Sequence, residues 1–249
     1  MAERTSPEVA TVVLVHGAFA DASSWNGVIE RLQAKGVQVM APANPLRGIT
    51  ADSAYLGAVL AQIEGPVLAV GHSYGGAVIT NAATDAENVV GLVYVAAFAP
   101  DEGETLGAAE AGSKDSVLNS ALVPRTYPTA DGGSATEFYI DPAKARDAFA
   151  GDLSDQRAAL IAATQRPVAD AAFGEPNGLL AWKHLPSWAV VATGDKAAGT
   201  DVVRSMAERA GAKITEVDGS HVIMVSQPDA VTSVILEAVG AVAAVPAGA

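Results

Sequence analysis

The chain has 249 residues, half of them hydrophobic and 17% charged, which excludes a disordered chain and allows a large core without disulfides or metal. The net charge of −13 disfavours a nucleic-acid partner, and the absence of Cys excludes disulfides, thiolate nucleophiles and Cys-ligated metals. The polar first residues and the short apolar tail predict neither a signal core nor a membrane span. We therefore expect a soluble cytoplasmic protein without a membrane partner. The oligomeric state stays open, with a homodimer as one candidate.

Short apolar runs alternate with helical patterns along the chain. Continuous apolar runs predict strands that are covered on both faces, as in parallel sheets. In chain order these runs are Thr11–Val15, Val37–Met40, Pro66–Val70, Gly91–Ala97, Trp188–Thr193 and Lys213–Val217. The helical patterns between them are Ser23–Ala34, Ala51–Ile63, Gly75–Ala86, Val202–Ala210 and Asp229–Val242. This alternation predicts an α/β fold with a doubly wound, mostly parallel sheet.

The alternation stops between the fourth and fifth of these strands. The composition there turns to Asp, Glu, Gly, Ser and Ala, and helical patterns return only at Pro142–Phe149 and Ser154–Thr164. We expect residues 99–185 to form a mostly helical cap insertion over one end of the sheet. Residues 1–98 and 186–249 would then form the α/β core of a single domain.

The sharpest motif is Gly71-His72-Ser73-Tyr74-Gly75, which fits Gly-x-Ser-x-Gly between an apolar run and a helical pattern. A sharp turn there lifts the Ser hydroxyl above the sheet edge, and small flanking residues make room for it. The N-terminus of the following helix adds backbone N–H groups and a partial positive charge. The motif therefore predicts Ser73 as a nucleophile rather than as a capping residue in a Gly-rich turn.

A second loop, Val15-His16-Gly17-Ala18-Phe19, directly follows the first predicted strand. A Ser nucleophile that attacks a carbonyl creates an oxyanion, and two backbone N–H donors must already point at it. We expect one donor from Tyr74 and the other from Ala18, with Phe19 as the second choice. The side chain of His16 is expected to make a structural hydrogen bond.

The general base must be one of four His residues. His221 follows the last predicted strand, in a loop where an α/β sheet gathers its site, whereas His72 adjoins the nucleophile and is expected to point elsewhere. Asp195 follows the preceding strand and is the expected acid, which gives the chain order Ser, Asp, His. Asp101 stays as an alternative acid, and Asp201 is expected to cap a helix.

Three segments in this order resemble the α/β-hydrolase superfamily across nearly the whole chain. They are VLVHGAFADASSW (Val13–Trp25), VGHSYGG (Val70–Gly76) and DGSHVIMVSQPDAV (Asp218–Val231). Within the superfamily, the sequence is similar to the small esterases related to plant methyl-ester esterases and hydroxynitrile lyases. The resemblance implies Ser73 as nucleophile, His221 as base, Asp195 as acid and Ala18 plus Tyr74 as oxyanion donors. It also implies that the insertion is a cap.

One segment departs from the family pattern. Relatives often carry a Pro shortly after the acid, but this chain has Lys196-Ala197-Ala198-Gly199-Thr200, which predicts a looser loop. The cap is the variable part of the superfamily, so the resemblance carries no substrate.

The sequence as a whole predicts a serine hydrolase that cleaves a small, mostly uncharged carboxylic ester through an acyl-enzyme. No metal or other cofactor is expected, and Phe19, Tyr139 and Trp182 are predicted to contact the substrate. Two alternatives stay open: a C–C hydrolase or lyase on the same scaffold, and a binding protein that turns over slowly.

Overall fold

A six-stranded sheet forms the centre of the computed structural model, which describes residues 9–243. The strands follow the order β2-β1-β3-β4-β8-β9, and every neighbouring pair is parallel. Their bounds are β1 Thr11–Val15, β2 Val39–Met40, β3 Val67–His72, β4 Val89–Val95, β8 Ser187–Ala192 and β9 Lys213–Val217. The α/β class and the parallel sheet predicted from the apolar runs are confirmed.

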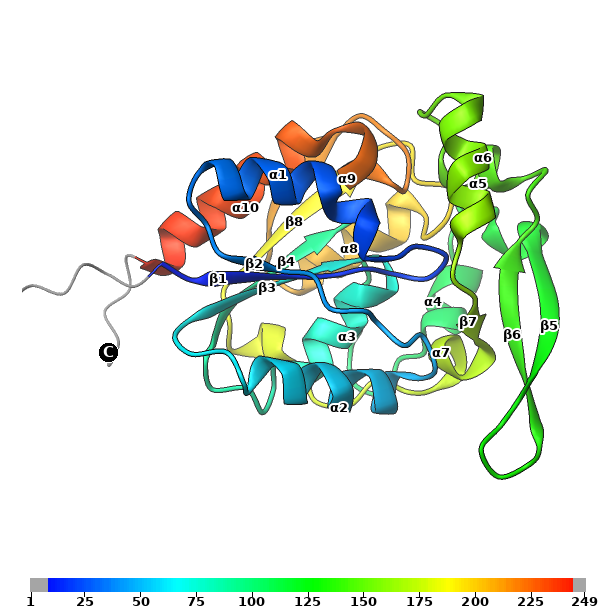
Figure 1. The fold of residues 1–249 in the computed structure, drawn as a ribbon, viewed down its shortest axis with the longest axis horizontal. Coiled ribbons are helices and arrows are strands. Elements are labelled where there is room, and N and C mark those ends of the chain that lie inside the picture. The colour runs from blue at the N-terminus through cyan, green and yellow to red at the C-terminus, as the bar shows by residue number, and fades with distance from the viewer. Residues whose placement is uncertain (1–8, 244–249) are drawn as a thin grey trace, which may run out of the picture.

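Helices cover both faces of this sheet (Figure 1). On one face α1 and α10 pack against each other, and on the other α2 packs against α3. The bounds are η1 Ala22–Trp25, α1 Asn26–Ala34, α2 Ile49–Leu60, α3 Tyr74–Ala82, α8 Thr200–Arg209, α9 Ile223–Ser226 and α10 Pro228–Ala243. All residues of β3 and β8 are buried, which explains why their sequences are apolar without alternation.

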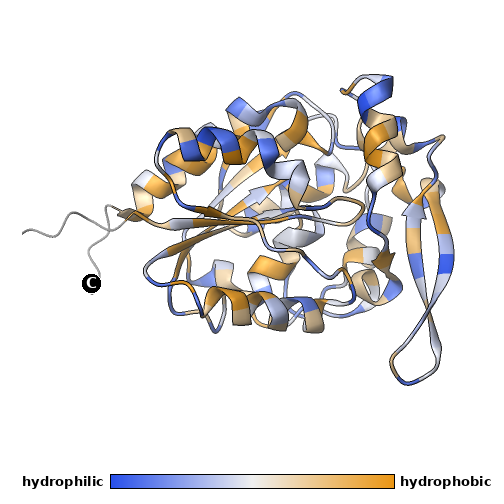
Figure 2. Cartoon of the chain, viewed as in Figure 1, coloured by the Kyte–Doolittle hydropathy of each residue, from blue (hydrophilic) through white to orange (hydrophobic). Residues whose placement is uncertain are grey.

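Hydrophobic residues line the sheet and the inner sides of the helices, while polar residues face outward (Figure 2). Within residues 9–243, no helix is long and apolar enough to cross a bilayer. The end of the apolar tail, residues 244–249, lies outside the described part of the chain.

A cap built from the residues between β4 and β8 stands beyond the carboxyl ends of the strands (Figure 1). Its elements are α4 Leu106–Ala111, η2 Leu118–Ala121, β5 Leu122–Pro128, β6 Ser134–Ile140, α5 Ala145–Phe149, α6 Asp155–Thr164, β7 Val168–Ala169, α7 Asp170–Gly174 and η3 Ala181–Lys183. The expectation of a mostly helical insertion is incomplete, because β5, β6 and β7 form a three-stranded antiparallel sheet.

The sequence did not predict this small sheet, and the prolines of β5 explain why. β5 contains Pro124 and ends at Pro128, and Pro in an apparent strand argues against a strand in a sheet interior. The structure places β5 at an edge of the sheet, where Pro is tolerated. The turn to β6 passes through Gly132 at φ 84°, a conformation that favours glycine.

Candidate active site

Ser73 stands at the sharp turn between β3 and α3. Its backbone has φ 53° and ψ −125°, a region that non-glycine residues rarely adopt. A Cβ on Gly71 would come within 2.5 Å of the Gly75 carbonyl oxygen, and a Cβ on Gly75 would strike the carbonyl oxygen of Val15. Both flanking positions therefore require glycine, as the motif predicts. Strained residues of this kind cluster at functional sites, where the surrounding structure holds them in place.

The loop after β1 packs directly against the turn at Ser73. A Cβ on Gly17 would come within 2.5 Å of the Ser73 Cβ, so only glycine permits this approach. The N–H of Phe19 donates to the carbonyl oxygen of Arg166 at 3.2 Å and is therefore occupied. This leaves the N–H of Ala18 as the better oxyanion donor in this loop, in line with the order predicted from the sequence.

Tyr74 begins α3, and its backbone N–H belongs to the first turn, whose amides have no partner within the helix. Its buried hydroxyl donates to Asp52 Oδ2 at 2.8 Å, and the Asp52 carboxylate also accepts the N–H groups of Arg47 and Gly48. Burial raises the pKa of Asp52 above its ordinary value, although these hydrogen bonds lower it. The Tyr74 side chain is thereby anchored to the segment that leads into α2.

His221 and Asp195 form a buried pair at the carboxyl edge of the sheet. The Nδ1 atom of His221 lies 2.8 Å from Asp195 Oδ2, and each residue is 1% exposed. Asp195 Oδ1 accepts the N–H groups of Ala197 and Ala198 at 2.9 and 3.0 Å. The loop Lys196–Thr200 thus wraps the carboxylate closely, and the expectation that it is looser than in relatives stays a prediction.

The other acidic residues considered from the sequence lie elsewhere. Asp101 is about half exposed, and its carboxylate pairs with Lys183 Nζ at 3.6 Å. Asp201 was expected as a helix cap, but that prediction is wrong because Gly199 occupies the cap position at φ 88°. The Asp201 carboxylate instead accepts the Ser113 hydroxyl at 2.5 Å, which ties α8 to the cap.

Two aromatic rings that the sequence did not assign to the site lie against His221. The His72 ring is 4.7 Å away between centroids, and its Nε2–H donates to the His221 carbonyl oxygen at 3.0 Å. Burial lowers the pKa of His72 well below its ordinary value, so the ring is neutral. Phe149, from the cap, lies 5.0 Å from the His221 ring and 6.1 Å from the Phe19 ring. Their positions depend on contacts between distant segments, which no local motif encodes.

The remaining two His residues lie outside this group. His16 Nδ1–H donates to the Gly17 carbonyl oxygen at 3.0 Å, while its Nε2 accepts the backbone N–H of Asn44 at 2.9 Å. Burial lowers the pKa of His16, which agrees with a neutral ring that both donates and accepts. The structural role expected for His16 is confirmed, and His184 is exposed.

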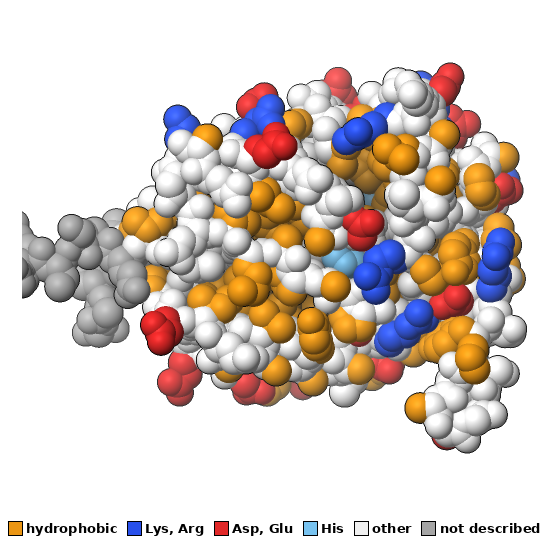
Figure 3. Space-filling model, viewed as in Figure 1, with side chains coloured by type: hydrophobic (Ala, Val, Ile, Leu, Met, Phe, Trp, Pro, Cys, Tyr) orange, Lys and Arg blue, Asp and Glu red, His pale blue; other side chains and the backbone are white. Residues whose placement is uncertain are grey.

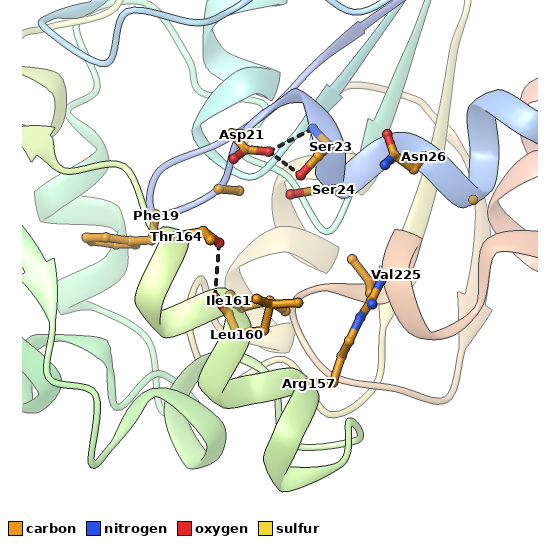
Figure 4. Close-up of a pocket in the computed structure, with 12 residues that line it drawn as sticks. Phe19, Asp21, Ser23, Ser24, Asn26, Arg157, Leu160, Ile161, Thr164 and Val225 are labelled. Atoms are coloured by element: carbon orange, nitrogen blue, oxygen red, sulfur yellow. Dashed lines mark hydrogen bonds between the residues drawn. The ribbon is translucent and has the colours of Figure 1, made fainter.

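A cavity of 270 Å³ lies between the loop after β1 and the cap helix α6 (Figure 4). Phe19 lines it from the loop, Leu160 and Ile161 from α6, and Val225 from α9. Phe19 also packs against Phe149, which lies against His221, whereas Ser73 and His221 are not among the residues that line the cavity. Its size suits a small group rather than a long chain.

The two cap residues predicted to contact substrate occupy different places. Tyr139 lies on β6, where its hydroxyl donates to Glu137 Oε1 at 3.3 Å and Arg125 lies 4.8 Å above its ring. Trp182 lies on η3 beside α3, and its indole N–H donates to the Pro100 carbonyl oxygen at 3.0 Å. Their roles in substrate binding stay predictions.

Charged side chains join the cap to the core. On the face drawn in Figure 3, basic side chains gather at the junction of core and cap, among hydrophobic and acidic ones. One such contact is the pair between Arg47 Nη1 and Glu137 Oε2 at 2.7 Å, in which the Glu137 side chain is largely buried. The same Arg47 guanidinium lies 4.4 Å above the Tyr127 ring. The cap hairpin is therefore held against the segment that precedes α2.

Comparison with known proteins agrees with this geometry. The model of the alpha/beta hydrolase family matches residues 12–234, which is most of the chain. The chain belongs to the alpha/beta hydrolase family. The match spans both the parallel core and the cap.

Two curated relatives resemble parts of this alpha/beta hydrolase. A carbendazim hydrolyzing esterase from Nocardioides sp. (strain SG-4G) is 34% identical over 133 residues, which cover 48% of this chain and 50% of the relative. A pyrethroid hydrolase from Sphingobium wenxiniae is 33% identical over 111 residues, or 39% of each chain. The matches thus span half or less of the relatives' own lengths.

Solved structures match over a larger share of the chain. A pyrethroid hydrolase from Sphingobium faniae JZ-2 has a TM-score of 0.76 at 21% identity, covering 94% of this chain and 98% of its own. Polyneuridine aldehyde esterase has a TM-score of 0.77 at 23% identity, covering 93% and 99%. These likenesses establish the fold.

Proposed function

We propose that this alpha/beta hydrolase is a serine esterase that cleaves a small, mostly uncharged carboxylic ester. The observation that carries the proposal is the buried His221–Asp195 pair, 2.8 Å apart, at the sheet edge where the strained Ser73 also stands. The esterase and hydrolase names of the two curated relatives support the same class of reaction.

In this mechanism Ser73 Oγ attacks the ester carbonyl carbon while His221 Nε2 takes the hydroxyl proton. Asp195 accepts the Nδ1–H of His221, which fixes the tautomer that leaves Nε2 free to act as a base. Burial of the pair excludes competing hydrogen bonds from water. The carbonyl oxygen becomes an oxyanion that accepts the N–H groups of Ala18 and Tyr74.

The tetrahedral intermediate then collapses. The bond to the alcohol breaks, and the leaving oxygen takes the proton from His221. Water attacks the acyl-enzyme, gives one proton to His221, and releases the acid as Ser73 regains its proton. The cycle balances without an oxidant, a metal or an organic cofactor.

The cavity beside Phe19 supports a small substrate. Its apolar wall of Leu160, Ile161 and Val225 would hold an acyl or alcohol group of a few carbons. A cytoplasmic location and the absence of nucleic-acid and membrane partners stay predictions, and the oligomeric state stays open, with a homodimer as one candidate.

The decisive experiment combines fluorophosphonate labelling with p-nitrophenyl acetate turnover, in the wild type and in Ser73→Ala. We expect labelling at Ser73 in the wild type only, and a loss of turnover on the order of 10⁶ in the variant. The melting temperature should stay nearly unchanged, which shows that the variant folds. A variant that keeps a tenth of wild-type turnover would refute the acyl-enzyme. Labelling without turnover would favour the slow ligand-binding alternative.

A further inference from the structure

A segment of the cap is hydrogen-bonded to the loop that carries Asp195. We call residues 110–118 the clamp segment and residues 195–201 the acid loop. Backbone carbonyl oxygens of the acid loop accept two of these hydrogen bonds. The Val117 N–H donates to the Lys196 carbonyl oxygen at 2.8 Å, and the Ser116 hydroxyl donates to the Ala197 carbonyl oxygen at 2.6 Å. At the far end of the loop, the Asp201 carboxylate accepts the Lys114 N–H at 2.8 Å. The clamp segment thus holds the loop at both ends.

Glu110, on α4, lies behind this contact and is 4% exposed. Its Oε1 atom is 3.1 Å from the Ser116 hydroxyl oxygen, and its carboxyl also accepts the backbone N–H of Asn119. The Ser116 hydroxyl has a single proton, but it lies within reach of two acceptors, Glu110 and the Ala197 carbonyl. The contact to Ala197, at 2.6 Å against 3.1 Å, is the better hydrogen bond for that proton. The contact to Glu110 is then a hydrogen bond only if Glu110 supplies a proton of its own.

Burial raises the pKa of the Glu110 carboxyl above its ordinary value and outweighs the neighbouring groups that lower it. A raised pKa favours the protonated form of Glu110, in which the carboxyl can donate a hydrogen bond to the Ser116 oxygen.

The hydrogen bonds continue from the clamp segment to the site. The peptide group that accepts the Ser116 proton at the Ala197 carbonyl oxygen carries the N–H of Ala198, which donates to Asp195 Oδ1 at 3.0 Å. The other oxygen of Asp195 accepts the Nδ1–H of His221. An unbroken chain therefore runs from Glu110 through Ser116, the acid loop and Asp195 to His221.

We propose that Glu110 is a positioning residue, a neutral carboxylic acid that donates to Ser116 and so fixes the orientation of the Asp195 carboxylate. Glu110 touches neither the substrate nor the reacting atoms. It acts through the direction in which Asp195 Oδ2 faces His221, and thus on the rate of proton transfer rather than on substrate binding. The kinetic part of this inference rests on the proposed esterase function.

Three variants test this series of hydrogen bonds. Glu110→Gln keeps an N–H donor for Ser116 and an acceptor for Asn119, so kcat should stay within about twofold of the wild type. Glu110→Ala and Ser116→Ala each break the chain and should lower kcat about five- to twentyfold with KM unchanged. Because both substitutions break the same series of hydrogen bonds, kcat of the double variant should be no lower than that of either single variant. Ser120→Ala is the matched control, since this exposed hydroxyl donates only to the Val117 carbonyl oxygen.

A second readout does not depend on turnover. The proton between His221 Nδ1 and Asp195 Oδ2 gives a low-field proton resonance, which should weaken or move in Glu110→Ala and Ser116→Ala and persist in Glu110→Gln. Loss of kcat and of the resonance in Glu110→Gln as well would show that an ionised carboxylate is required, which overturns the proposal. An unaltered resonance in folded Ser116→Ala would also overturn it. A wild type that shows the resonance but no ester turnover would refute the esterase function alone.

Discussion

Phe149 of the cap lies against the ring of His221 in the core, with the ring centroids 5.0 Å apart and the planes tilted by 53°. Both residues are nearly fully buried, so the cap forms part of the immediate surroundings of the proposed base. The cap therefore lines a cavity and also shields the His221–Asp195 pair from water.

Replacing Phe149 tests this shielding. Phe149→Ala should destabilise the fold by about 3–5 kcal/mol because it leaves a cavity, as urea unfolding would measure. Phe149→Leu should cost less than about 1.5 kcal/mol and stay folded, yet lower kcat/KM about tenfold as water reaches His221. Phe173→Ala, on α7, is the control for a cap aromatic residue outside the contact. Wild-type kcat/KM in Phe149→Leu would contradict the shielding role.

The assignment of the acid is tested by a pair of variants. Asp195→Asn should lower kcat by about 10⁴, because the amide no longer favours the His221 tautomer with a proton on Nδ1. Asp101→Asn should leave kcat nearly unchanged, since Asp101 pairs with Lys183 instead. Steady-state kinetics with p-nitrophenyl acetate gives both values. The reverse result would place the acid after β4.

Ester chain length tests the wall of the cavity. Each buried methylene group is worth about 0.8 kcal/mol, so neighbouring homologues should differ modestly in kcat/KM. Leu160→Ala enlarges the cavity beside Phe19 and should move the optimum toward longer acyl chains, measured with p-nitrophenyl esters from acetate to octanoate. Tyr139→Ala and Trp182→Ala test the two residues assigned from sequence in the same assay. An unchanged profile would remove the residue concerned from the substrate site.

Stability should fall as the pH drops below about 6.5, because of the buried histidines. Burial lowers the pKa values of His16 and His72 in the folded state, so the unfolded chain binds more protons there. Their stabilising contribution is present above the unfolded pKa and is lost as the pH falls through the range below it. Each contributes a slope of at most about 1.4 kcal/mol per pH unit.

Urea unfolding between about pH 7.5 and 5.5 measures this slope. The raised pKa values of Asp52 and Glu110 act in the opposite direction, since their contribution is lost as the pH rises. Glu110→Gln removes one of these opposing contributions and should steepen the slope. His184→Asn, which changes an exposed ring, should leave it unaltered. A free energy of unfolding that rises toward pH 5.5 in Glu110→Gln would contradict the prediction.

The sequence predicted what local patterns encode. The bounds of β1 and β9 agree with their apolar runs, and the glycines around Ser73 indicated the turn that the backbone adopts. The sequence did not predict the cap hairpin, because Pro in β5 is acceptable only at a sheet edge and the edge position is a property of the assembled sheet. Glu110 and Phe149 were not found for a related reason. Phe149 contacts His221, more than 70 positions away along the chain, and Glu110 reaches the acid loop only through Ser116, which contacts Ala197 81 positions away.

The cap begins after β4 and ends before β8, and these strands are neighbours in the sheet. Because β4 and β8 are parallel, the segment leaves the carboxyl end of β4 and must return to the amino end of β8, at the opposite edge of the sheet. An exchanged cap must therefore include a return path that leads back to the amino end of β8. A transplanted cap would bring a new substrate wall, but it would remove residues 110–118 from the loop that carries Asp195. A successful exchange must therefore supply its own support for that loop.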